Sequence, residues 1–190
     1  MAKLIFRYSA MNSGKTTNLL QVAHNYEERD FNVKIAKPAI DTKAGNYVSS
    51  RIGLEREVDY LIYPNEDIKL DRGVQVLLVD EAQFLNKEQI NELYYFSKYY
   101  NILVICYGLR CDFRGQGFEG STRLLQIADE IEELKTVCFC GKKATFNLRL
   151  KDGKPTFEGQ QVEIDNQHKI KYDSVCGDCF IRILTKYFDK

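Results

Sequence analysis

Residues 4–17 read LIFRYSAMNSGKTT. An apolar run from Leu4 to Phe6 precedes the Gly-Lys-Thr string, and an amphipathic stretch that contains Leu19 and Val22 follows it. This is the order of a strand, a tight loop and a helix, the context in which such a string binds phosphate. Backbone N–H groups of the loop then face one concavity, and the helix N-terminus adds positive partial charge. The stretch therefore predicts a phosphate-binding loop.

The predicted loop carries side chains suited to a nucleotide and its metal ion. Lys15 would reach the outer phosphates, and the Thr16 hydroxyl would bind Mg²⁺. Ser9 stands where the pattern has its first glycine, and a small serine can take that turn with some strain. The alternative is that the Gly-Lys-Thr string occurs here by chance, but the flanking strand and helix argue against it. The donor-binding residues predicted here are Ser9, Ala10, Met11, Asn12, Ser13, Gly14, Lys15 and Thr16.

Composition narrows the class of protein. The 190 residues suffice for one domain, or for one domain with an appendage, and a hydrophobic content of 44% supports a core. The 27 basic residues balance 27 acidic ones without a long basic block, which argues against nonspecific nucleic-acid binding. No apolar run reaches membrane-spanning length, and Arg7 interrupts the short N-terminal one, so we expect no signal peptide. We expect a cytoplasmic protein that binds neither nucleic acid nor membrane.

Apolar runs and helical spacing alternate along the chain as far as Gly108. The expected strands are 3–8, 33–36, 58–62, 74–79 and 102–107, and the expected helices are 15–28 and 87–97. Residues 40–56 have little apolar periodicity and are expected to form a mobile loop. This alternation implies an α/β fold, a mostly parallel sheet with helices on both faces. Ligands bind beyond the carboxyl ends of such strands, so Ser9, Asp80 and Gly108 are expected to converge.

An acidic pair, Asp80 and Glu81, follows the apolar run at 76–79. An aspartate at a strand end can hold Mg²⁺ opposite Thr16. Apolar runs that end in an acidic residue are common in α/β proteins. The assignment of Asp80 to Mg²⁺ therefore depends on the predicted phosphate-binding loop that precedes it in the chain. Three roles remain open for Glu81: a general base toward an acceptor hydroxyl, a base that orients water in a hydrolase, or a solvated surface carboxylate.

Four of the six cysteines form two pairs, which are Cys138 with Cys140 and Cys176 with Cys179. In a reducing compartment such a cluster favours a metal over a disulfide framework. Four thiolates can hold Zn²⁺ tetrahedrally, in a closed and therefore structural site. Between the pairs, residues 141–175 contain short alternating runs and are expected to form a loop anchored at both ends, which suits a lid. His24 and His168 do not pair with the cluster and are expected to be ordinary surface or loop histidines.

Taken together, these residues resemble those of the type II thymidine kinases, the tetrameric zinc-containing class, over essentially the whole chain. The resemblance rests on residues 8–15, 80–84 and 107–115 and on the two cysteine pairs. Bacterial members carry serine in place of the first loop glycine, as at Ser9. The resemblance implies a RecA-like phosphate-loop kinase domain at 1–137, a small zinc-ribbon-like domain with a substrate lid at 138–190, and a homotetramer.

The resemblance also implies an activity, the transfer of the γ-phosphate of ATP to the 5′-hydroxyl of thymidine, and of deoxyuridine, in nucleotide salvage for DNA synthesis. Glu81 matches the acid that activates the hydroxyl, and Ala82 and Gln83 continue the nucleotide-binding segment. By position, the nucleoside-binding residues are Met11, Leu109, Phe113, Phe118, Asn147, Arg149 and Tyr172. Two features depart from the family pattern: one residue separates the first cysteines where some members have two, and the lid around residues 165–171 is slightly longer.

Other functions remain open on the sequence alone. A monophosphate acceptor would call for an arginine cluster, whereas Arg110, Arg114 and Arg123 are interleaved with Phe and Gly, which suits an uncharged base. Arg51 could approach the phosphates or be an ordinary surface arginine. The alternatives are another small phosphate-loop kinase, an ATP hydrolase, or an ATP-dependent nucleic-acid-binding module that uses the zinc cluster.

Overall fold

The computed structural model describes residues 1–42, 44–161 and 170–189, which form two compact units. The first unit comprises Met1–Tyr8, Gly14–Leu109 and Phe118–Leu134. The second unit comprises Ser9–Ser13, Arg110–Gly117 and the remainder of the chain from Lys135. The boundary that the sequence predicts between residues 137 and 138 stays a prediction.

The first unit is built on a six-stranded sheet with the strand order β5-β2-β6-β7-β1-β8. Its pairings of β1 with β8, of β2 with β5 and β6, and of β6 with β7 are all parallel. The prediction of a mostly parallel α/β sheet is therefore confirmed. Its strands are β1 (Leu4–Ser9), β2 (Val33–Pro38), β5 (Tyr60–Ile62), β6 (Val76–Val79), β7 (Leu103–Leu109) and β8 (Glu130–Glu133).

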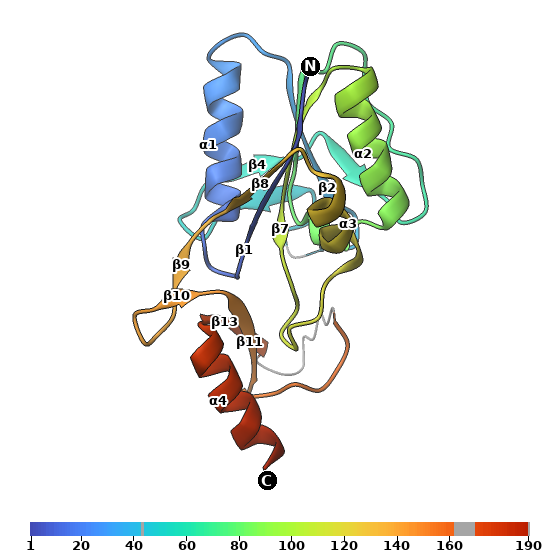
Figure 1. The fold of residues 1–190 in the computed structure, drawn as a ribbon. Helices are drawn as coiled ribbons and strands as arrows, with labels where there is room; N and C mark the ends of the chain where they lie inside the picture. Colours follow the sequence, from blue (N-terminus) through green and yellow to red (C-terminus); the bar gives the residue numbers. More distant parts are fainter. Residues whose placement is uncertain (43, 162–169, 190) are drawn as a thin grey trace. The chain divides into compact units, whose positions relative to one another are not determined.

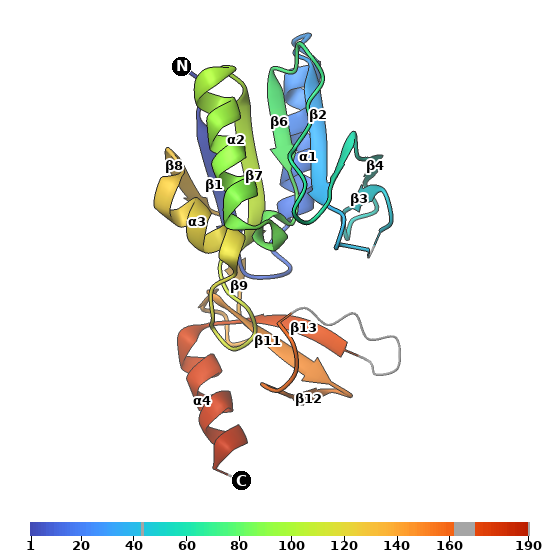
Figure 2. The same ribbon diagram turned by 90° about the vertical axis from the view of Figure 1, so that its right-hand side faces the viewer.

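Alternating residues of the central strands pack against helices on opposite faces, because successive side chains of a strand point to opposite sides. Ile5 and Ile105 share a core with Leu19 of α1 (Lys15–Glu27), which covers one face (Figure 1). The other face is covered by α2 (Lys87–Tyr99) and α3 (Glu119–Ile127), and its core includes Phe6 and Val104 (Figure 2). The two covered faces leave the strand ends as the place where polar side chains gather.

Local sequence explains where α2 begins. The Asn86 side chain accepts a hydrogen bond of 2.8 Å from the Gln89 backbone N–H, and the Gln89 side chain accepts one of 3.2 Å from the Asn86 N–H. This capping box satisfies two of the N–H groups that a helix start leaves without partners. Of the described helices, none is both long and apolar enough to cross a membrane.

The structure corrects the element predictions at several places. Residues 40–56 are not wholly irregular, because β3 (Tyr47–Ser49) pairs antiparallel with β4 (Glu55–Glu57). The helix α3 and the strand β8 were not expected. The strand β8 is rich in glutamate and lacks an apolar run, and its place in the sheet comes from pairing with β1.

The second unit has a small core of its own, which includes Leu148, Phe157, Val175 and Phe180. The segment between the cysteine pairs was expected to be an anchored loop with short alternating β-like runs, and its described part contains β10, β11, β12 and β13. These strands belong to two small antiparallel sheets, β10-β9 and β12-β11-β13. Residues 162–169, which include His168 and the part of the predicted lid lengthening at 165–169, lie outside the described residues. The elements are β9 (Thr136–Val137), β10 (Lys143–Ala144), β11 (Phe146–Lys151), β12 (Lys154–Pro155), β13 (Ile170–Val175) and α4 (Gly177–Phe188).

Candidate active site

The segment between β1 and α1 contains two residues with left-handed backbone. Asn12 has a φ of 60° and Gly14 a φ of 78°. Left-handed residues in a turn can direct neighbouring backbone N–H groups into a concavity that binds anions. A Cβ added to Gly14 would meet nothing within 4 Å, so the backbone conformation, not lack of space, favours glycine there.

Ser9 does not carry the strain that the sequence suggested. It is the last residue of β1, where the backbone is extended and open to any residue. Its buried hydroxyl donates to the Ala10 carbonyl at 2.7 Å, and it also bonds to the Ser13 hydroxyl. Because the Ser9 proton is given to Ala10, Ser13 is the donor in the second bond. A serine here therefore ties the two ends of the loop segment together, which glycine could not do.

Thr16 and Asp80 meet in the first unit. The Thr16 hydroxyl donates to Asp80 Oδ2 at 3.0 Å, and the Glu81 backbone N–H donates to Asp80 Oδ1 at 3.0 Å. Burial, and then the charge of Glu81, raise the pKa of Asp80 well above its ordinary value, although Thr16 and the charge of Lys15 act in the opposite direction. A cation bound here would favour the carboxylate and so reverse this shift. The pair offers two oxygen ligands of the kind that Mg²⁺ takes.

Gln83 holds the carboxylate of Glu81. Glu81 has a left-handed φ of 49° and precedes the short 3₁₀ helix η1 (Ala82–Phe84). The Gln83 side-chain amide donates to the Glu81 carboxylate, and its Oε1 accepts from the Leu109 backbone N–H at 3.1 Å. Gln83 is buried, so its carboxamide fixes the Glu81 side chain relative to the end of β7. The interpretation of Glu81 as a freely solvated carboxylate is therefore disfavoured.

Two glycines allow this close packing. A Cβ on Gly108 would lie 2.9 Å from Gln83 Oε1, closer than a carbon can approach without displacing the amide. A Cβ on Gly120, near the start of α3, would lie 2.5 Å from the Ala82 carbonyl oxygen and 2.6 Å from that of Leu85. The sequence does not single out Gly120, because the backbone it approaches is distant along the chain.

Two of the predicted nucleoside-binding residues, Leu109 and Phe118, belong to the first unit. Leu109 ends β7, and its carbonyl accepts a hydrogen bond of 2.6 Å from the buried Ser121 hydroxyl. Phe118 is buried immediately before α3 and packs edge-on against Phe84, with ring centroids 5.7 Å apart. Both residues are thus fixed near Glu81 and Gln83 by short-range packing around η1.

Three other predicted residues lie together in the second unit. The Arg149 guanidinium lies over the Phe113 ring, 4.6 Å from its centroid, and both side chains are buried. Arg149 also donates to the Gln160 carbonyl at 3.1 Å. Tyr172 is opposite Arg149 in the β11–β13 register, and burial raises the pKa of its hydroxyl. Arg149 and Phe113 therefore form a buried cation–aromatic contact against this sheet.

The loop at residues 110–117 is shaped by Asp112, which the prediction of site residues left out. The buried Asp112 carboxylate accepts from the backbone N–H of Arg114 at 2.9 Å and of Gln116 at 2.8 Å, and the Arg114 guanidinium lies 3.1 Å from it. An aspartate that bonds N–H groups two residues onward is a turn signal that the sequence could have supplied. This turn positions Phe113.

The four paired cysteines converge in the second unit. The sulfur atoms of the four all lie within 4.8 Å of one another. Cys138, Cys176 and Cys179 are buried, and Cys140 is exposed. Two elements bring the pairs together, the turn between β9 and β10 and the start of α4. Four sulfur donors at this spacing are compatible with a closed zinc site.

The thiols of the cluster differ in how readily they lose their protons. Burial acts to raise the pKa of the Cys138 thiol, but the backbone N–H groups of Cys140 and Cys176 and the neighbouring thiols outweigh it and lower that pKa. Burial raises the pKa of Cys179. A metal ion would stabilise all four as thiolates, since a ligand sulfur must lose its proton.

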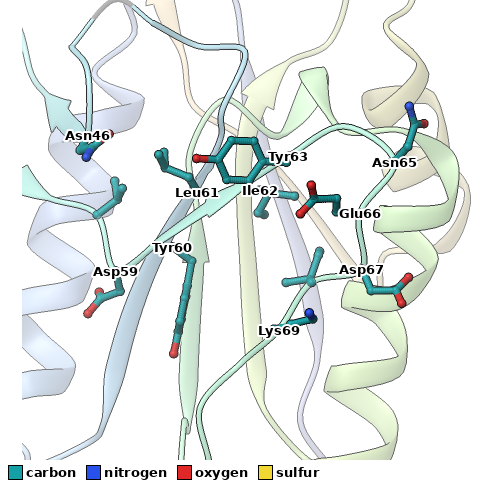
Figure 3. A pocket seen from close by; sticks show the side chains of 12 residues that line it. Asn46, Asp59, Tyr60, Leu61, Ile62, Tyr63, Asn65, Glu66, Asp67 and Lys69 are labelled. Atoms are coloured by element: carbon teal, nitrogen blue, oxygen red, sulfur yellow. The ribbon is translucent and has the colours of Figure 1, made fainter.

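A separate pocket of about 770 Å³ lies along β5 in the first unit. Figure 3 shows Asp59 just before β5, Tyr60 at its start, and Glu66, Asp67 and Lys69 on the segment that leaves it. Among the described residues that line this pocket, none is a predicted site residue. The pocket is therefore distinct from the residues around Thr16 and Asp80.

Comparison with known proteins agrees with this geometry. The sequence matches the family described as thymidine kinase over residues 2–180. The chain belongs to the thymidine kinase family. The thymidine kinase of Chromobacterium violaceum is 47% identical over 183 residues, which cover 95% of this chain and 98% of that protein. The thymidine kinase of the phage T4 is 46% identical over 185 residues, which cover 93% and 94% of the two chains.

In this member of the thymidine kinase family, two further side chains take part in the loop structure. Asn147 was predicted to contact the nucleoside, but its buried amide bonds to the backbone of Met11 and Cys111, at 2.8 Å and 2.7 Å. Ser174 was not predicted at all, and its hydroxyl donates to the Met11 carbonyl. A serine in a strand near a cysteine pair gives no sign of a partner in the N-terminal loop.

Proposed function

We propose that the protein transfers the γ-phosphate of ATP to the 5′-hydroxyl of thymidine, and of deoxyuridine, and so forms the monophosphate for DNA synthesis by nucleotide salvage. The observation that carries the proposal is the contact of Thr16 with Asp80, beside a Glu81 carboxylate held by Gln83. Membership of the thymidine kinase family supports thymidine as the acceptor.

The donor would be bound by the loop and the first turn of α1. Lys15, the backbone N–H groups of the loop and the helix N-terminus supply positive charge for the triphosphate. Thr16 and Asp80 would hold Mg²⁺, which neutralises charge that develops on the phosphate oxygens. Ala82 and Gln83 complete the donor-side residues: Ser9, Ala10, Met11, Asn12, Ser13, Gly14, Lys15, Thr16, Asp80, Glu81, Ala82 and Gln83.

Glu81 would accept the proton of the sugar hydroxyl. A carboxylate is a weak base for an alcohol, so orientation of the hydroxyl is the larger part of its effect and proton transfer comes late. Gln83 supports this role because it fixes one carboxylate oxygen by a hydrogen bond and leaves the other for the substrate. Thr16 in the first turn of α1 and Asp80 and Glu81 directly after β6 would together align the donor and the hydroxyl for in-line transfer.

The nucleoside would be bound by aromatic and apolar side chains. Met11, Leu109, Phe113, Phe118 and Tyr172 offer surfaces for a flat, uncharged base, and Arg149 supports Phe113 from behind. The buried Arg149 already donates hydrogen bonds to backbone carbonyls. A phosphate group on the acceptor would therefore find few available donors among these residues.

The remaining proposals concern the metal and the assembly. Cys138, Cys140, Cys176 and Cys179 would hold a structural Zn²⁺. The zinc-binding part, residues 138–190, would carry a lid between its cysteine pairs, at 141–175, that excludes water from the donor, because stray water would hydrolyse ATP. From the family resemblance we further propose a cytoplasmic homotetramer, which binds neither nucleic acid nor membrane.

The proposal is tested with the purified zinc-loaded protein, Mg-ATP and a panel of natural nucleosides, scored for the monophosphate product. Thymidine should be phosphorylated most efficiently, deoxyuridine next, and purine nucleosides hardly at all. ATP consumption without a nucleoside would instead support a hydrolase. Phosphorylation of thymidine monophosphate in preference to thymidine would support a nucleotide kinase.

A further inference from the structure

Side chains of the second unit hold both backbone groups of Met11. Asn147 on β11 and Ser174 on β13 are direct partners in the antiparallel register, and each is no more than 2% exposed. Asn147 Oδ1 accepts from the Met11 N–H at 2.8 Å, and the Ser174 hydroxyl donates to the Met11 carbonyl. One cross-strand pair therefore clamps a single residue of the phosphate-binding loop from both sides.

The neighbouring residue is held by the same sheets. The Asn12 side-chain amide donates to the Tyr172 carbonyl at 3.4 Å, and the Thr136 hydroxyl donates to the Asn12 carbonyl at 3.3 Å. Asn147 also donates through Nδ2 to the Cys111 carbonyl at 2.7 Å. The contacts explain why Ser9–Ser13 and Arg110–Gly117 belong to the second unit although they are distant in sequence.

These bonds have two consequences for the loop. The Met11 N–H is already used, so other N–H groups of the loop must be the ones that face a phosphate. The left-handed backbone of Asn12 costs free energy for a residue with a side chain, and contacts on both sides of it maintain that conformation. The carboxamide of Asn147 is committed to main chain at both its atoms, so it acts on the loop instead of on the base.

We propose that Asn147 and Ser174 are positioning residues, which transmit order in the β11–β13 sheet to the phosphate-binding loop through Met11. The inference rests on the proposed function, because Arg149 and Tyr172 of the same two strands are proposed to bind the nucleoside. A nucleoside that orders these strands also orders Met11, so the donor then binds a loop already in its competent shape. Nucleoside and donor thus raise each other's affinity.

The test compares Ser174→Ala with Ser97→Ala in the zinc-loaded protein. Ser97 is a matched control, because its buried hydroxyl also donates to a carbonyl, that of Tyr94 at 2.8 Å, within α2. Calorimetric titration gives the dissociation constant of a non-hydrolysable Mg-ATP analogue with and without saturating thymidine. In the wild type and in Ser97→Ala, saturating thymidine should lower the dissociation constant of the analogue by about five-fold or more. In Ser174→Ala this ratio of the two dissociation constants should fall most of the way to one.

A second variant keeps the test decisive if Ser174→Ala fails to fold. Asn147→Leu removes the acceptor for the Met11 N–H from the opposite strand and should lower the same ratio. The clamp is overturned if thymidine leaves the dissociation constant of the analogue unchanged in the wild type. It is also overturned if the folded, zinc-loaded variants show the same ratio of dissociation constants as the wild type. Failure of the wild type to phosphorylate thymidine overturns the proposed function, whereas phosphorylation with unchanged ratios overturns the clamp alone.

Discussion

At the scale of single residues, Glu81 is the side chain whose chemistry can be tested most directly. Glu81→Gln keeps the shape and removes the proton acceptor, so kcat should fall by about 10²-fold or more. Binding of Mg-ATP should remain nearly intact, because Lys15 and Thr16 are unchanged. Steady-state kinetics and donor titration measure the two effects. Glu88→Gln, on the exposed first turn of α2, is the matched control, and wild-type turnover in Glu81→Gln would exclude the base.

Single residues differ in how far the sequence could predict them. The proximity of Thr16 and Asp80 follows from two motifs at strand ends of one parallel sheet, and the structure contains that contact. Their role in binding Mg²⁺ stays a prediction. The partners of Gln83 and Ser174 could not be predicted, because each hydrogen bond joins segments whose proximity depends on tertiary packing.

At the scale of elements, the packing of α3 on η1 depends on Gly120. In Gly120→Ala the new methyl group would lie 2.5 Å from a backbone oxygen, so the helix must move. We expect a loss of about 1–3 kcal/mol in the free energy of unfolding, measured with urea. Gly177→Ala is the control, because its nearest atom would be 3.7 Å away, and it should change stability by less than about 0.5 kcal/mol. Equal stability of the two variants would contradict this packing.

The cysteine cluster is a second test at this scale. Cys176→Ser replaces one sulfur ligand at the start of α4, which should lower the zinc content and loosen the strand β13 that precedes it. The KM for thymidine should rise several-fold, more than the KM for ATP. Zinc analysis and kinetics measure both, with Cys106→Ser as a cysteine control outside the cluster. Loss of zinc with an unchanged KM would contradict the role of the metal in anchoring the lid.

Elements with strong apolar patterns were predictable and the others were not. The runs that became β1, β6 and β7 are apolar and buried, and the helical spacing at 87–97 became α2. The hairpin of β3 and β4, the strand β8 and the sheet of β11 and β13 lack such runs. These segments form strands because of the strands they pair with. The local residue pattern does not reveal which strand will be the partner.

At the scale of the whole molecule, stability should depend on pH through Asp129, which links the start of β1 to α2. Burial acts to raise the pKa of Asp129, but hydrogen bonds from Lys98 and from the Leu4 backbone N–H outweigh it and lower that pKa. The stabilisation is therefore present above about pH 4, the ordinary aspartate value, and is lost as pH falls through the lower folded value. Asp129→Asn should cost about 1 kcal/mol at pH 7 and less in acid.

Urea unfolding at pH 7 and in acid measures this difference. Asp30→Asn is the control, because Asp30 is exposed and asparagine tolerates its left-handed backbone. A cost for Asp129→Asn that is the same at both pH values would contradict the assignment. At this scale the sequence indicated a change of character after residue 137. It could not indicate that Met11 would bond to Asn147, a residue 136 positions away.

The strand β8 ends one side of the described sheet and carries Glu130, Glu132 and Glu133. Lys3, just before β1, pairs with Glu130, and Arg7 within β1 pairs with Glu132. Charged side chains on an edge strand disfavour its pairing with a strand of another chain. Replacing the glutamates with valine or threonine would turn the border into a template for aggregation. We therefore expect the glutamates of this edge to disfavour strand pairing between molecules.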